Sequence, residues 1–308
     1  MSVALCIVTL FRPEGLGNLL EGIRRLDVGP EGNLDLSVIV VDNDENGSAR
    51  PVVERAAATL EWPVRYVIEP VRGIPHARNR AVAEAGEVDL LAFIDDDEVP
   101  EPDWLRVVLE VRQRAGATVV LGPSLPRFDE APPAWIVRGG FFERTRFTTG
   151  EVIPSYYART SGVLIERAAL GPDAFDVRFR YTGFEDTEFF SRVASRGGRI
   201  VWADEARVIE TVPASRANLR WLLLRSYRNG ACRSITLTVI DRAPLLRRLK
   251  RVIAGLSTIV AGVVTAAVGV VRGRAGVARG LQGAAYGSGL IGGLVGLGHD
   301  EYRVIHGR

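Results

Sequence analysis

The chain has 308 residues, of which 47% are hydrophobic and 25% are charged. This balance is typical of a globular protein with a sizeable core and excludes a disordered chain. The formal net charge is only +2, and no run of Lys and Arg is interleaved with aromatic residues, so we expect no nucleic-acid partner. Cys6 and Cys232 are the only cysteines, and neither has a CxxC or histidine partner nearby, which indicates neither a metal site nor a disulfide.

The first hundred residues alternate between apolar runs of strand length and segments with helical spacing of apolar residues. The expected strands are Val3–Leu10, Leu36–Val41, Val64–Ile68 and Leu90–Ile94. The expected helices are Gly15–Leu26, Pro51–Leu60 and the segment GIPHARNRAVAEAG. This alternation predicts an α/β fold in which a mostly parallel central sheet is flanked by helices on both faces, with ligands bound at the carboxyl ends of the strands.

The order of elements becomes less regular after residue 100. One further strand is expected at 118–121 and helices at 103–114, 185–196 and 216–225, while the segment FDEAPPAWIVRGG carries turn residues. After Pro244 the composition changes abruptly, because RRLKR is followed by the uncharged run Val252–Val271. We therefore expect two units, at residues 1–230 and 231–308, the second being a helical C-terminal module.

The stretch LLAFIDDDEVPEPDWL places three aspartates and a glutamate directly after an apolar strand. Asp95 and Asp97 are two residues apart, so both can face one side as the strand ends. Mg²⁺ and Mn²⁺ take oxygen ligands and are often held by one or two carboxylates together with substrate phosphates. The cluster therefore favours a divalent-metal site, and the other interpretation is a turn in which Asp103 caps the next helix.

Two other motifs share these letters, and they and the phosphate loop need residues that the chain lacks. An EF-hand loop is excluded because Val99 and Pro100 stand where an oxygen ligand and the turn glycine are needed. The DDDEV start is shared with haloacid-dehalogenase-like phosphatases, which need a lysine at a later strand end. The only lysine is Lys250, in a basic helix-like segment, and the same absence excludes a phosphate loop with Gly-Lys-Ser/Thr.

Four segments, taken in order, carry a resemblance to a known family. They are IVTLFRP, VIVVDNDENGS, GIPHARNRAVAEA before FIDDDEVP, and GFEDTEFFSRVASRGGRIVW. The set resembles the family 2 glycosyltransferases, which have the GT-A fold, over roughly residues 3–230. The resemblance implies a nucleotide-binding half at 1–100, an acceptor half at 101–230, and an enzyme similar to those of bacterial exopolysaccharide biosynthesis. The alternative is a non-catalytic sugar-nucleotide-binding or membrane scaffold protein with the same fold.

The resemblance also implies which residues bind the donor, a nucleotide sugar with a UDP-sugar as the first expectation. These are Thr9, Asp42, Arg78, Asn79, Asp95 and Asp96. Asp42 would accept a hydrogen bond from the imide N–H if the base is uracil, or would only hold a turn after the strand. Arg78 would pair with a phosphate or hold the aspartates, or form a structural ion pair.

The metal-binding Asp-x-Asp (DxD) pair of the family falls on Asp95 and Asp97, and Asp97 is the firmer ligand in this resemblance. Family members often have a histidine ligand after the last matching helix, where this chain has ARVIETVP. Glu210 stands at or near that place. It is therefore expected as the third ligand of Mg²⁺ or Mn²⁺, unless a third protein ligand is missing.

The segment GFEDTEFF supplies the expected catalytic groups. The resemblance makes Asp186 the general base for the acceptor hydroxyl and Glu185 a contact to the acceptor. A single displacement by this route inverts the anomeric carbon, while a divalent ion spreads the charge that grows on the diphosphate. The other interpretation is that the acidic pair only compensates the dipole at a helix N-terminus.

Small residues recur at alternating spacings of four and three in the C-terminal module. They are Gly262, Ala266, Gly269, Gly273, Gly276, Gly280, Gly283 and Gly287. Such a stripe lets helices approach closely, as they do in lipid, whereas so many glycines weaken a helix exposed to water. Basic residues flank the apolar run on both sides, which favours an embedded hairpin or in-plane helix pair over a single span or a soluble packing arm.

The first residues, MSVALCIVTLFRPEG, lack the basic start and the cleavage site of a signal peptide. We therefore expect a cytoplasmic catalytic domain held peripherally or monotopically at the cytoplasmic face of the cell membrane. A glycan or a lipid-linked acceptor would suit that location.

Overall fold

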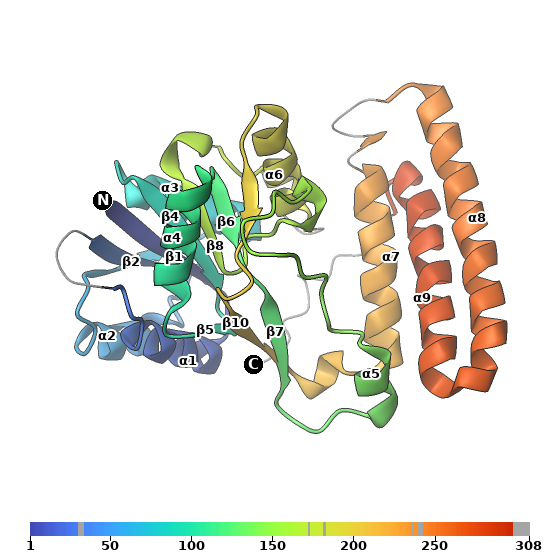
Figure 1. Cartoon of the computed structure of the whole chain (residues 1–308), viewed down its shortest axis with the longest axis horizontal. Coiled ribbons are helices and arrows are strands. Elements are labelled where there is room, and N and C mark those ends of the chain that lie inside the picture. The colour runs from blue at the N-terminus through green and yellow to red at the C-terminus, as the bar shows by residue number, and fades with distance from the viewer. Residues whose placement is uncertain (30–33, 172, 181–182, 236, 239–242, 298–308) are drawn as a thin grey trace.

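The computed structural model describes residues 1–29, 34–171, 173–180, 183–235, 237–238 and 243–297. Residues 298–308 of the predicted C-terminal module therefore lie outside the described residues. Figure 1 shows an α/β lobe on the left and a layer of long helices on the right.

A seven-stranded sheet forms the centre of the α/β lobe, in the order β3-β2-β1-β4-β8-β6-β9. Its strands are β1 (Ser2–Thr9), β2 (Asp35–Asp42), β3 (Val64–Ile68), β4 (Leu90–Asp95), β6 (Val119–Leu121), β8 (Val163–Glu166) and β9 (Ile200–Trp202). All neighbours are parallel except β8, which runs antiparallel to both β4 and β6. This confirms the predicted mostly parallel sheet.

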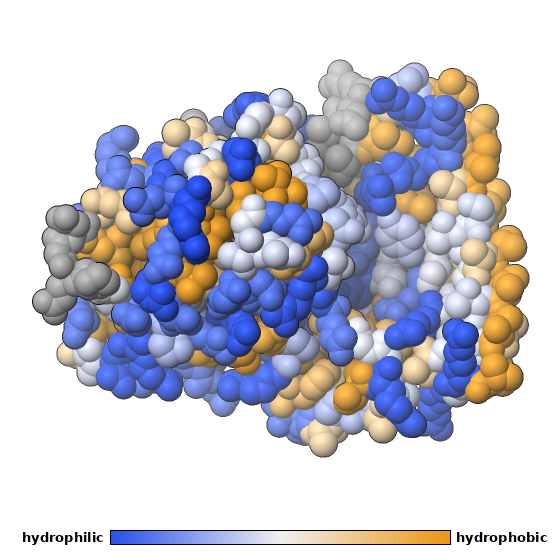
Figure 2. All heavy atoms as spheres, in the orientation of Figure 1, coloured by the Kyte–Doolittle hydropathy of each residue, from blue (hydrophilic) through white to orange (hydrophobic). Residues whose placement is uncertain are grey.

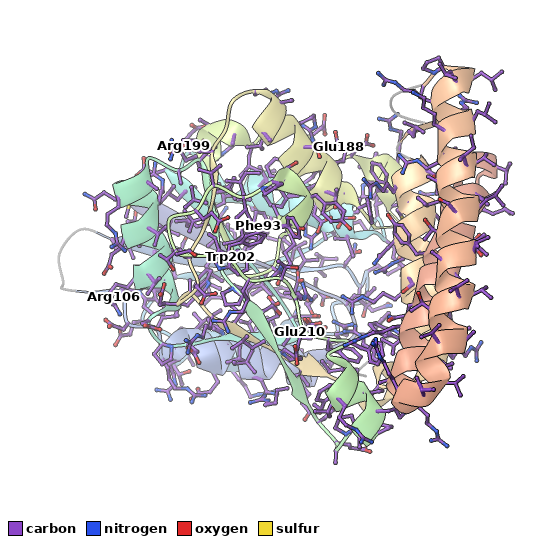
Figure 3. All side chains as sticks on the ribbon, turned by 45° about the vertical axis from the view of Figure 1, so that its right-hand side comes forward. Phe93, Arg106, Glu188, Arg199, Trp202 and Glu210 are labelled. Carbon is purple, nitrogen blue, oxygen red and sulfur yellow. The ribbon has the colours of Figure 1, made fainter. Side chains whose placement is uncertain are left out.

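Helices cover both faces of this sheet, as the continuous apolar strands predicted. They are α1 (Pro13–Arg24), α2 (Arg50–Ala57), α3 (Ile74–Ala85), α4 (Trp104–Ala115) and α6 (Glu185–Ser195). One core cluster joins the sheet to α1, α2 and α4, and a second joins its other face to α3 and α6. Phe93 and Trp202 lie inside the lobe, whereas Arg199 is exposed at its surface (Figure 3).

The structure contains several short elements that the sequence did not predict, most of them after residue 120. A small second sheet has the order β5-β10-β7, formed by β5 (Glu98–Pro100), β7 (Ser124–Phe128) and β10 (Val208–Val212), and the short helix α5 (Ala134–Gly139) follows β7. The two strands β8 and β9 of the main sheet were also missed. Strands of three to five residues are too short to show a period, so their pairing is decided by tertiary contacts.

The helical layer consists of α7 (Leu219–Ile235), α8 (Leu245–Gly269) and α9 (Gly273–Gly292), and α9 lies between the other two (Figure 1). The sequence predicted α7 only up to residue 225. The helix in fact continues through residue 230, where the domain boundary was expected, and its second half packs on α9.

Glycine backbones make the contacts within this layer. An added Cβ at Gly230 of α7 would lie 2.1 Å from the carbonyl oxygen of Tyr286, and one at Gly262 of α8 would lie 2.4 Å from the backbone nitrogen of Ala284. The predicted stripe of small residues is therefore a helix–helix seam, and the chain turns near Gly273 (φ 70°) so that the two halves of the stripe face each other. Figure 2 shows that apolar side chains cover the outer edge of α8 instead.

Candidate active site

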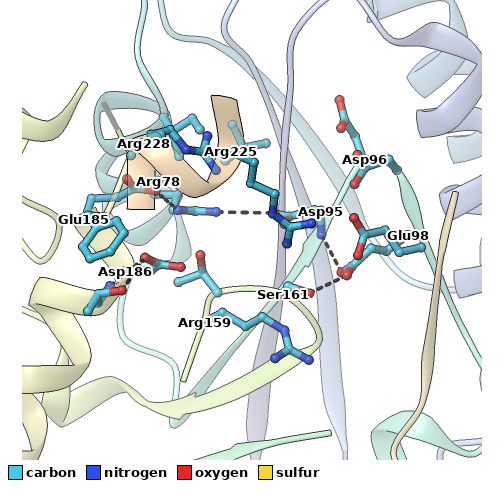
Figure 4. A pocket seen from close by; sticks show the side chains of 18 of the residues that line it. Arg78, Asp95, Asp96, Glu98, Arg159, Ser161, Glu185, Asp186, Arg225 and Arg228 are labelled. Carbon is cyan, nitrogen blue, oxygen red and sulfur yellow. Dashed lines mark hydrogen bonds and ion pairs between the residues drawn. The ribbon is translucent and has the colours of Figure 1, made fainter. Parts of the chain in front are cut away.

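One large pocket lies where the carboxyl ends of β1 and β4 face the helical layer (Figure 4). Register places Thr9 beside Asp42, and Val8 beside Asp95, so the polar ends of three neighbouring strands meet at one edge. The pocket encloses about 550 Å³. Its described lining carries nine arginines and seven carboxylates, so it remains positive when all of these groups are charged, which suits an anionic ligand.

The three aspartates after β4 all line this pocket and bind different partners. Asp96 is buried and accepts hydrogen bonds from the hydroxyl of Thr9 at 2.8 Å and from Arg12 at 2.8 Å. Asp97 accepts from Arg12 at 3.0 Å and from Arg216 at 3.3 Å. Asp103 occupies the N-cap position of α4, but its side chain makes no capping hydrogen bond. The cluster therefore belongs to the pocket more than to the helix start.

Asp95 is the last residue of β4 and connects the cluster to α3. Arg78 of α3 donates one hydrogen bond to Asp95 at 3.3 Å and another to Glu185, so a single buried guanidinium joins two walls of the pocket. Enclosure in the pocket raises the pKa of Asp95 to about 6, and Asp97 and Asp96 reinforce this effect while Arg78 opposes it. Arg78 therefore has the structural ion pair that one interpretation predicted, at a place where a ligand can also reach it.

A glycine sets the start of α3 and hence the position of Arg78. Gly73 has φ 141°, and an added Cβ would lie 2.8 Å from the Cβ of Arg180. No other residue fits this conformation and this space. The sequence GIPHARN thus places Arg78 just after the first turn of the helix, facing the strand ends.

The predicted acidic pair lies at the N-terminus of α6, on the pocket wall opposite the sheet edge (Figure 4). Phe184, just before it, has φ 80°, which is a strained conformation for a bulky residue and is common beside functional groups. Asp186 accepts hydrogen bonds from the backbone and hydroxyl of Thr187 and forms no ion pair with any described residue. Its carboxylate therefore remains available to a ligand.

Glu185 is buried and is bound to Arg78 through one carboxylate oxygen. Its other oxygen, Oε2, is buried and has no hydrogen-bond partner among the described residues. Burial raises the pKa of Glu185 to about 7, with Arg78 opposing the rise and Asp186 adding to it. A ligand hydroxyl in this part of the pocket could satisfy the free oxygen.

Glu210 of β10 lines the pocket, but arginines surround it. It accepts hydrogen bonds from Arg144 at 2.5 Å and from Ser124 at 3.0 Å, and Arg216 lies 3.9 Å away. Burial pushes the pKa of Glu210 upward, but nearby guanidinium groups outweigh burial and hold the pKa below its usual value. Arg216 contacts both Glu210 and Asp97, so a guanidinium lies between two of the three expected metal ligands.

Within the described residues, no group of three or more His, Cys, Asp or Glu side chains is arranged to hold a metal ion. Asp95, Asp97 and Glu210 line one pocket without forming a ready-made three-ligand site. One or two carboxylates are enough for Mg²⁺ when a substrate supplies phosphate oxygens. The donor set therefore fits a hard divalent ion bound together with its substrate, and Asp95 and Asp97 are the carboxylates that would hold it.

Two predicted donor-binding residues lie outside the pocket lining. Asp42 is fully buried and accepts hydrogen bonds from the backbone of Ala49 at 2.8 Å and from the hydroxyl of Tyr66 at 2.7 Å, as the turn interpretation predicted. Asn79 exchanges two hydrogen bonds with the backbone of Phe175. Asn43, the residue after Asp42, lines the pocket instead.

Other lining residues were missed in the sequence. Arg144, Arg159 and Ser161 come from the region after residue 120, which shows no clear period, whereas Arg12 and Glu98 lie within the motifs IVTLFRP and FIDDDEVP but were given no role. Glu98 is buried between Ser161, which donates a hydrogen bond to it, and the backbone of Asp95. The positions of Arg12 and Glu98 within these two motifs were the sequence signals available for them.

Arg159 differs from Arg12, Arg78 and Arg216 in that it forms no ion pair with a described carboxylate. It donates to the carbonyl of Gly122 at 3.2 Å, its Nε is buried without a partner, and no described carboxylate lies within 4.0 Å of it. Burial and the nearby Arg144 lower the pKa of Arg159 to about 10. It therefore has spare hydrogen-bonding capacity for an anion in the pocket.

Comparison with known proteins agrees with this geometry. Residues 4–166 match the sequence model of "Glycosyl transferase family 2". The chain is also 37% identical over 228 residues to the succinoglycan biosynthesis protein ExoM of Rhizobium meliloti (strain 1021), covering 73% of this chain and 71% of ExoM. The chain belongs to glycosyl transferase family 2. It is a glycosyltransferase, as the motif resemblance implied.

A second curated relative of this glycosyltransferase is a glucosyl-dolichyl phosphate glucuronosyltransferase of Haloferax volcanii, 25% identical over 245 residues, with 75% of each chain covered. Among solved structures, the fragment 1-349 of S. aureus TarS in complex with UDP has a TM-score of 0.55 at 16% identity, and 95% of this chain and 91% of the fragment align. The alignment with a longer TarS chain covers only 40% of that chain.

The mannosyltransferase PcManGT from Pyrobaculum calidifontis, in complex with GDP-Man and Mn²⁺, has a TM-score of 0.54 at 17% identity, covering 74% of this chain and 61% of PcManGT. These likenesses confirm the predicted GT-A fold of the family 2 enzyme.

Proposed function

We propose that the protein transfers a sugar from a nucleoside diphosphate donor to a hydroxyl acceptor, with inversion at the anomeric carbon. The observation that carries this proposal is the presence, in one pocket, of the strand-end aspartates and of Asp186 at the N-terminus of α6. One wall suits a diphosphate and its counter-ion. The other offers a carboxylate that forms no ion pair with described residues.

The donor is proposed to lie along the edge formed by β1 and β4. Thr9, Asn43 and the aspartates line that edge, and solved GT-A structures of similar fold contain UDP, UDP-GlcNAc or GDP-Man. We favour a UDP-sugar. Arg78 and Arg12 would stay near the diphosphate and neutralise part of its charge through charge-assisted hydrogen bonds.

We propose that Asp95 and Asp97 hold Mg²⁺ or Mn²⁺ when the donor binds. Such an ion would stabilise the negative charge that develops on the leaving diphosphate. Asp97 must then exchange at least one of its arginine partners, Arg12 and Arg216, for the ion. The released guanidinium groups would stay close enough to contact phosphate oxygens, so their charge is not lost from the site.

We propose Asp186 as the general base and Glu185 as an acceptor contact. In direct displacement, the acceptor oxygen forms a bond to the anomeric carbon while the bond to the diphosphate breaks, and Asp186 takes the hydroxyl proton. Glu185 is held by Arg78, and its unpaired Oε2 can accept a hydrogen bond from another hydroxyl of the acceptor. Attack from the face opposite the leaving group inverts the anomeric configuration.

The acceptor is proposed to be a glycan, either free or lipid-linked, and the enzyme is proposed to work at the cytoplasmic face of the membrane. The printed name of ExoM refers to succinoglycan biosynthesis, which supports a role in building an exopolysaccharide. Within the described residues, one helical stretch, Leu245–Val295, is long and apolar enough to cross a membrane.

Calorimetric titration with UDP and GDP, each with Mn²⁺ or with EDTA, tests the donor and metal sites together. We expect tight binding of one nucleotide that requires the ion, and a loss of about tenfold or more in Asp97→Asn. Asp103→Asn is the matched control, because Asp103 follows the same cluster but does not line the pocket. Equal affinity of Asp97→Asn and wild type in Mn²⁺ would remove Asp97 from the metal site.

A further inference from the structure

The outer face of α8 is a continuous apolar surface. Large hydrophobic side chains along it are more than half exposed, from Leu245 (81%) through Ile253 (59%) to Val260 (63%), and Val271 (86%) continues the surface in the turn that follows α8. They recur at helical spacing, so they form one stripe along the edge of the helical layer (Figure 2). A water-exposed stripe of this length is unusual for a soluble surface and indicates a contact with something apolar.

The rest of the described chain cannot cover this stripe. The inner face of α8 carries Gly255, Gly262 and Gly269, whose backbones pack directly on α9. The opposite side of α9 packs on α7, and α7 in turn lines the polar pocket with Arg225 and Arg228. The layer is thus fixed to the catalytic lobe on one side and open on the other.

The charged residues of the hairpin formed by α8 and α9 all have the same sign. Residues 243–297 contain seven basic residues and no acidic residue. Arg247, Arg248, Lys250 and Arg251 lie at the start of α8, and Arg272 and Arg274 lie at the turn after it. Basic groups therefore flank both ends of the apolar stripe.

We propose that the outer face of α8 lies in the plane of an anionic lipid bilayer and is the membrane-binding surface of the enzyme. Apolar side chains enter the boundary between headgroups and acyl chains, and the flanking basic groups contact acidic headgroups. This inference goes beyond the proposed reaction, because it concerns a surface separated from the pocket by two helices.

The structure argues against two alternatives, which are that α8 spans the bilayer and that a second copy of the chain covers the stripe. If α8 crossed the bilayer, α9 and α7 would enter lipid with it, although Arg279 of α9 donates to the carbonyl of Gly139 in α5 at 2.9 Å and α7 carries pocket arginines. If a second copy covered the stripe, the basic ends of two hairpins would meet without any acidic partner on either α8 or α9. An anionic bilayer supplies both the apolar layer and the opposite charge.

Co-sedimentation of the full chain with lipid vesicles tests the proposal. One set of vesicles is pure phosphatidylcholine, and the other also contains about 30 mol% phosphatidylglycerol, which is anionic. We expect binding that is stronger on the anionic vesicles and weaker in high salt. Ile253→Gln, Val260→Gln and Val264→Gln combined should abolish binding to both vesicles. Val137→Gln, Val152→Gln and Val177→Gln combined, which change exposed valines outside the helical layer, should bind like wild type.

A separate variant tests how much the basic residues contribute to vesicle binding. Arg247→Gln with Lys250→Gln should reduce the partition coefficient on anionic vesicles by about fivefold per residue and leave neutral vesicles nearly unchanged. Thermal unfolding of all variants near the wild-type temperature would show that the fold is retained. Unfolding at a much lower temperature would instead assign the stripe to internal packing and overturn the proposal.

Three other results would overturn it. Binding by the α8 triple variant would place the membrane contact elsewhere. Resistance of the full chain to extraction from cell membranes by alkaline carbonate would show a spanning helix. A stable dimer in solution that the triple variant dissociates would show that a second copy covers the stripe.

Discussion

At the residue scale, the carboxylates of the pocket differ in whether they are paired with arginine. The aspartates after β4 are held by Thr9, Arg12 and Arg216, whereas Asp186 forms no ion pair with described residues. Carboxylates that bind arginine are poor proton acceptors because the ion pair stabilises their charged form. Asp186 differs from the strand-end aspartates in that its described hydrogen bonds are only to Thr187, so its carboxylate is open to the hydroxyl of an acceptor.

We expect Asp186→Asn to reduce transfer by about 10² to 10⁴ while donor affinity stays within about twofold of wild type, because an amide keeps the shape of the side chain but cannot accept the proton. Single-turnover transfer rates and nucleotide titration measure the two quantities. Glu188→Gln, on the same helix but outside the pocket lining, is the control. A fall of less than about tenfold in Asp186→Asn would assign the base to another group.

Glu185 makes stability depend on pH in a definite direction. Its folded pKa of about 7 lies above the ordinary value of 4.5, so the native chain binds a proton that the unfolded chain has already released in this range. The free energy of unfolding should therefore fall as the pH rises from about 4.5 to about 7, by at most about 1.4 kcal/mol per pH unit from this group. Denaturant unfolding in EDTA at several pH values should show a smaller fall for Glu185→Gln than for wild type, and equal slopes would contradict the assignment.

Arg159 should act in opposite directions on stability and on binding. A buried guanidinium without a described carboxylate partner destabilises the ligand-free fold, and a bound diphosphate would pair with it. Arg159→Met should raise the melting temperature and weaken nucleoside diphosphate binding by about tenfold or more. Arg127→Met, an exposed residue outside the lining, should change neither quantity. Unchanged binding in Arg159→Met would limit Arg159 to a structural role.

At the scale of elements, the glycine seam explains how three helices pack at such close range. Gly280 of α9 faces Ala266 of α8, where an added Cβ would lie 2.1 Å from the backbone nitrogen. Gly283, less than one turn later, has only the Cα of Gly262 within 4 Å, at 3.4 Å. Replacing either glycine with alanine changes the intrinsic helix propensity equally. A difference between the two variants therefore measures the effect of close packing.

Gly280→Ala should lower the melting temperature by at least about 3 °C, because α8 and α9 must move apart. Gly283→Ala should keep or raise it, because alanine is the better helix former by about 1 kcal/mol and meets no clash. Circular dichroism of the full chain in one detergent measures both variants. Equal shifts in the two variants would mean that the seam contributes no specific packing.

At the scale of the whole molecule, α7 belongs to both parts of the structure. One side carries Trp221, Arg225 and Arg228 into the pocket, and the side with Gly230 and Ala231 packs on α9. The helical layer is therefore more than a candidate membrane anchor. It also supports one wall of the active site.

A chain that ends at Ala243 should bind nucleoside diphosphate more weakly than the full chain, by about tenfold or more, because α7 loses the surface that holds it. Thermal shift with UDP and Mn²⁺ measures the loss. The triple glutamine variant of the α8 outer face is the matched control, since it should lose membrane binding and keep nucleotide binding. Wild-type affinity in the shortened chain would show that α7 keeps its place without α9.

The sequence by itself determined the elements that have a clear period and the groups that follow them. The strands of the first hundred residues, the aspartates after β4, the acidic pair at the start of α6 and the small-residue stripe were all visible, because burial imposes a spacing and a motif occupies consecutive positions. The expected metal set and the role of Asp42 could not be predicted as well, because the ion pairs from Arg216 and Arg144 and the hydrogen bond from the Tyr66 hydroxyl come from distant segments.

Only the tertiary structure decided where the short strands of the second sheet pair, which arginines surround the pocket, and that the stripe is an internal seam with the apolar stripe of α8 on the outside. These features depend on contacts between residues far apart in the chain, and strands of three to five residues carry no pattern strong enough to predict them. The same physical reason places α7 in both parts of the molecule: its pocket face and its glycine face are distinguished by what packs against them, and not by the sequence of the helix alone.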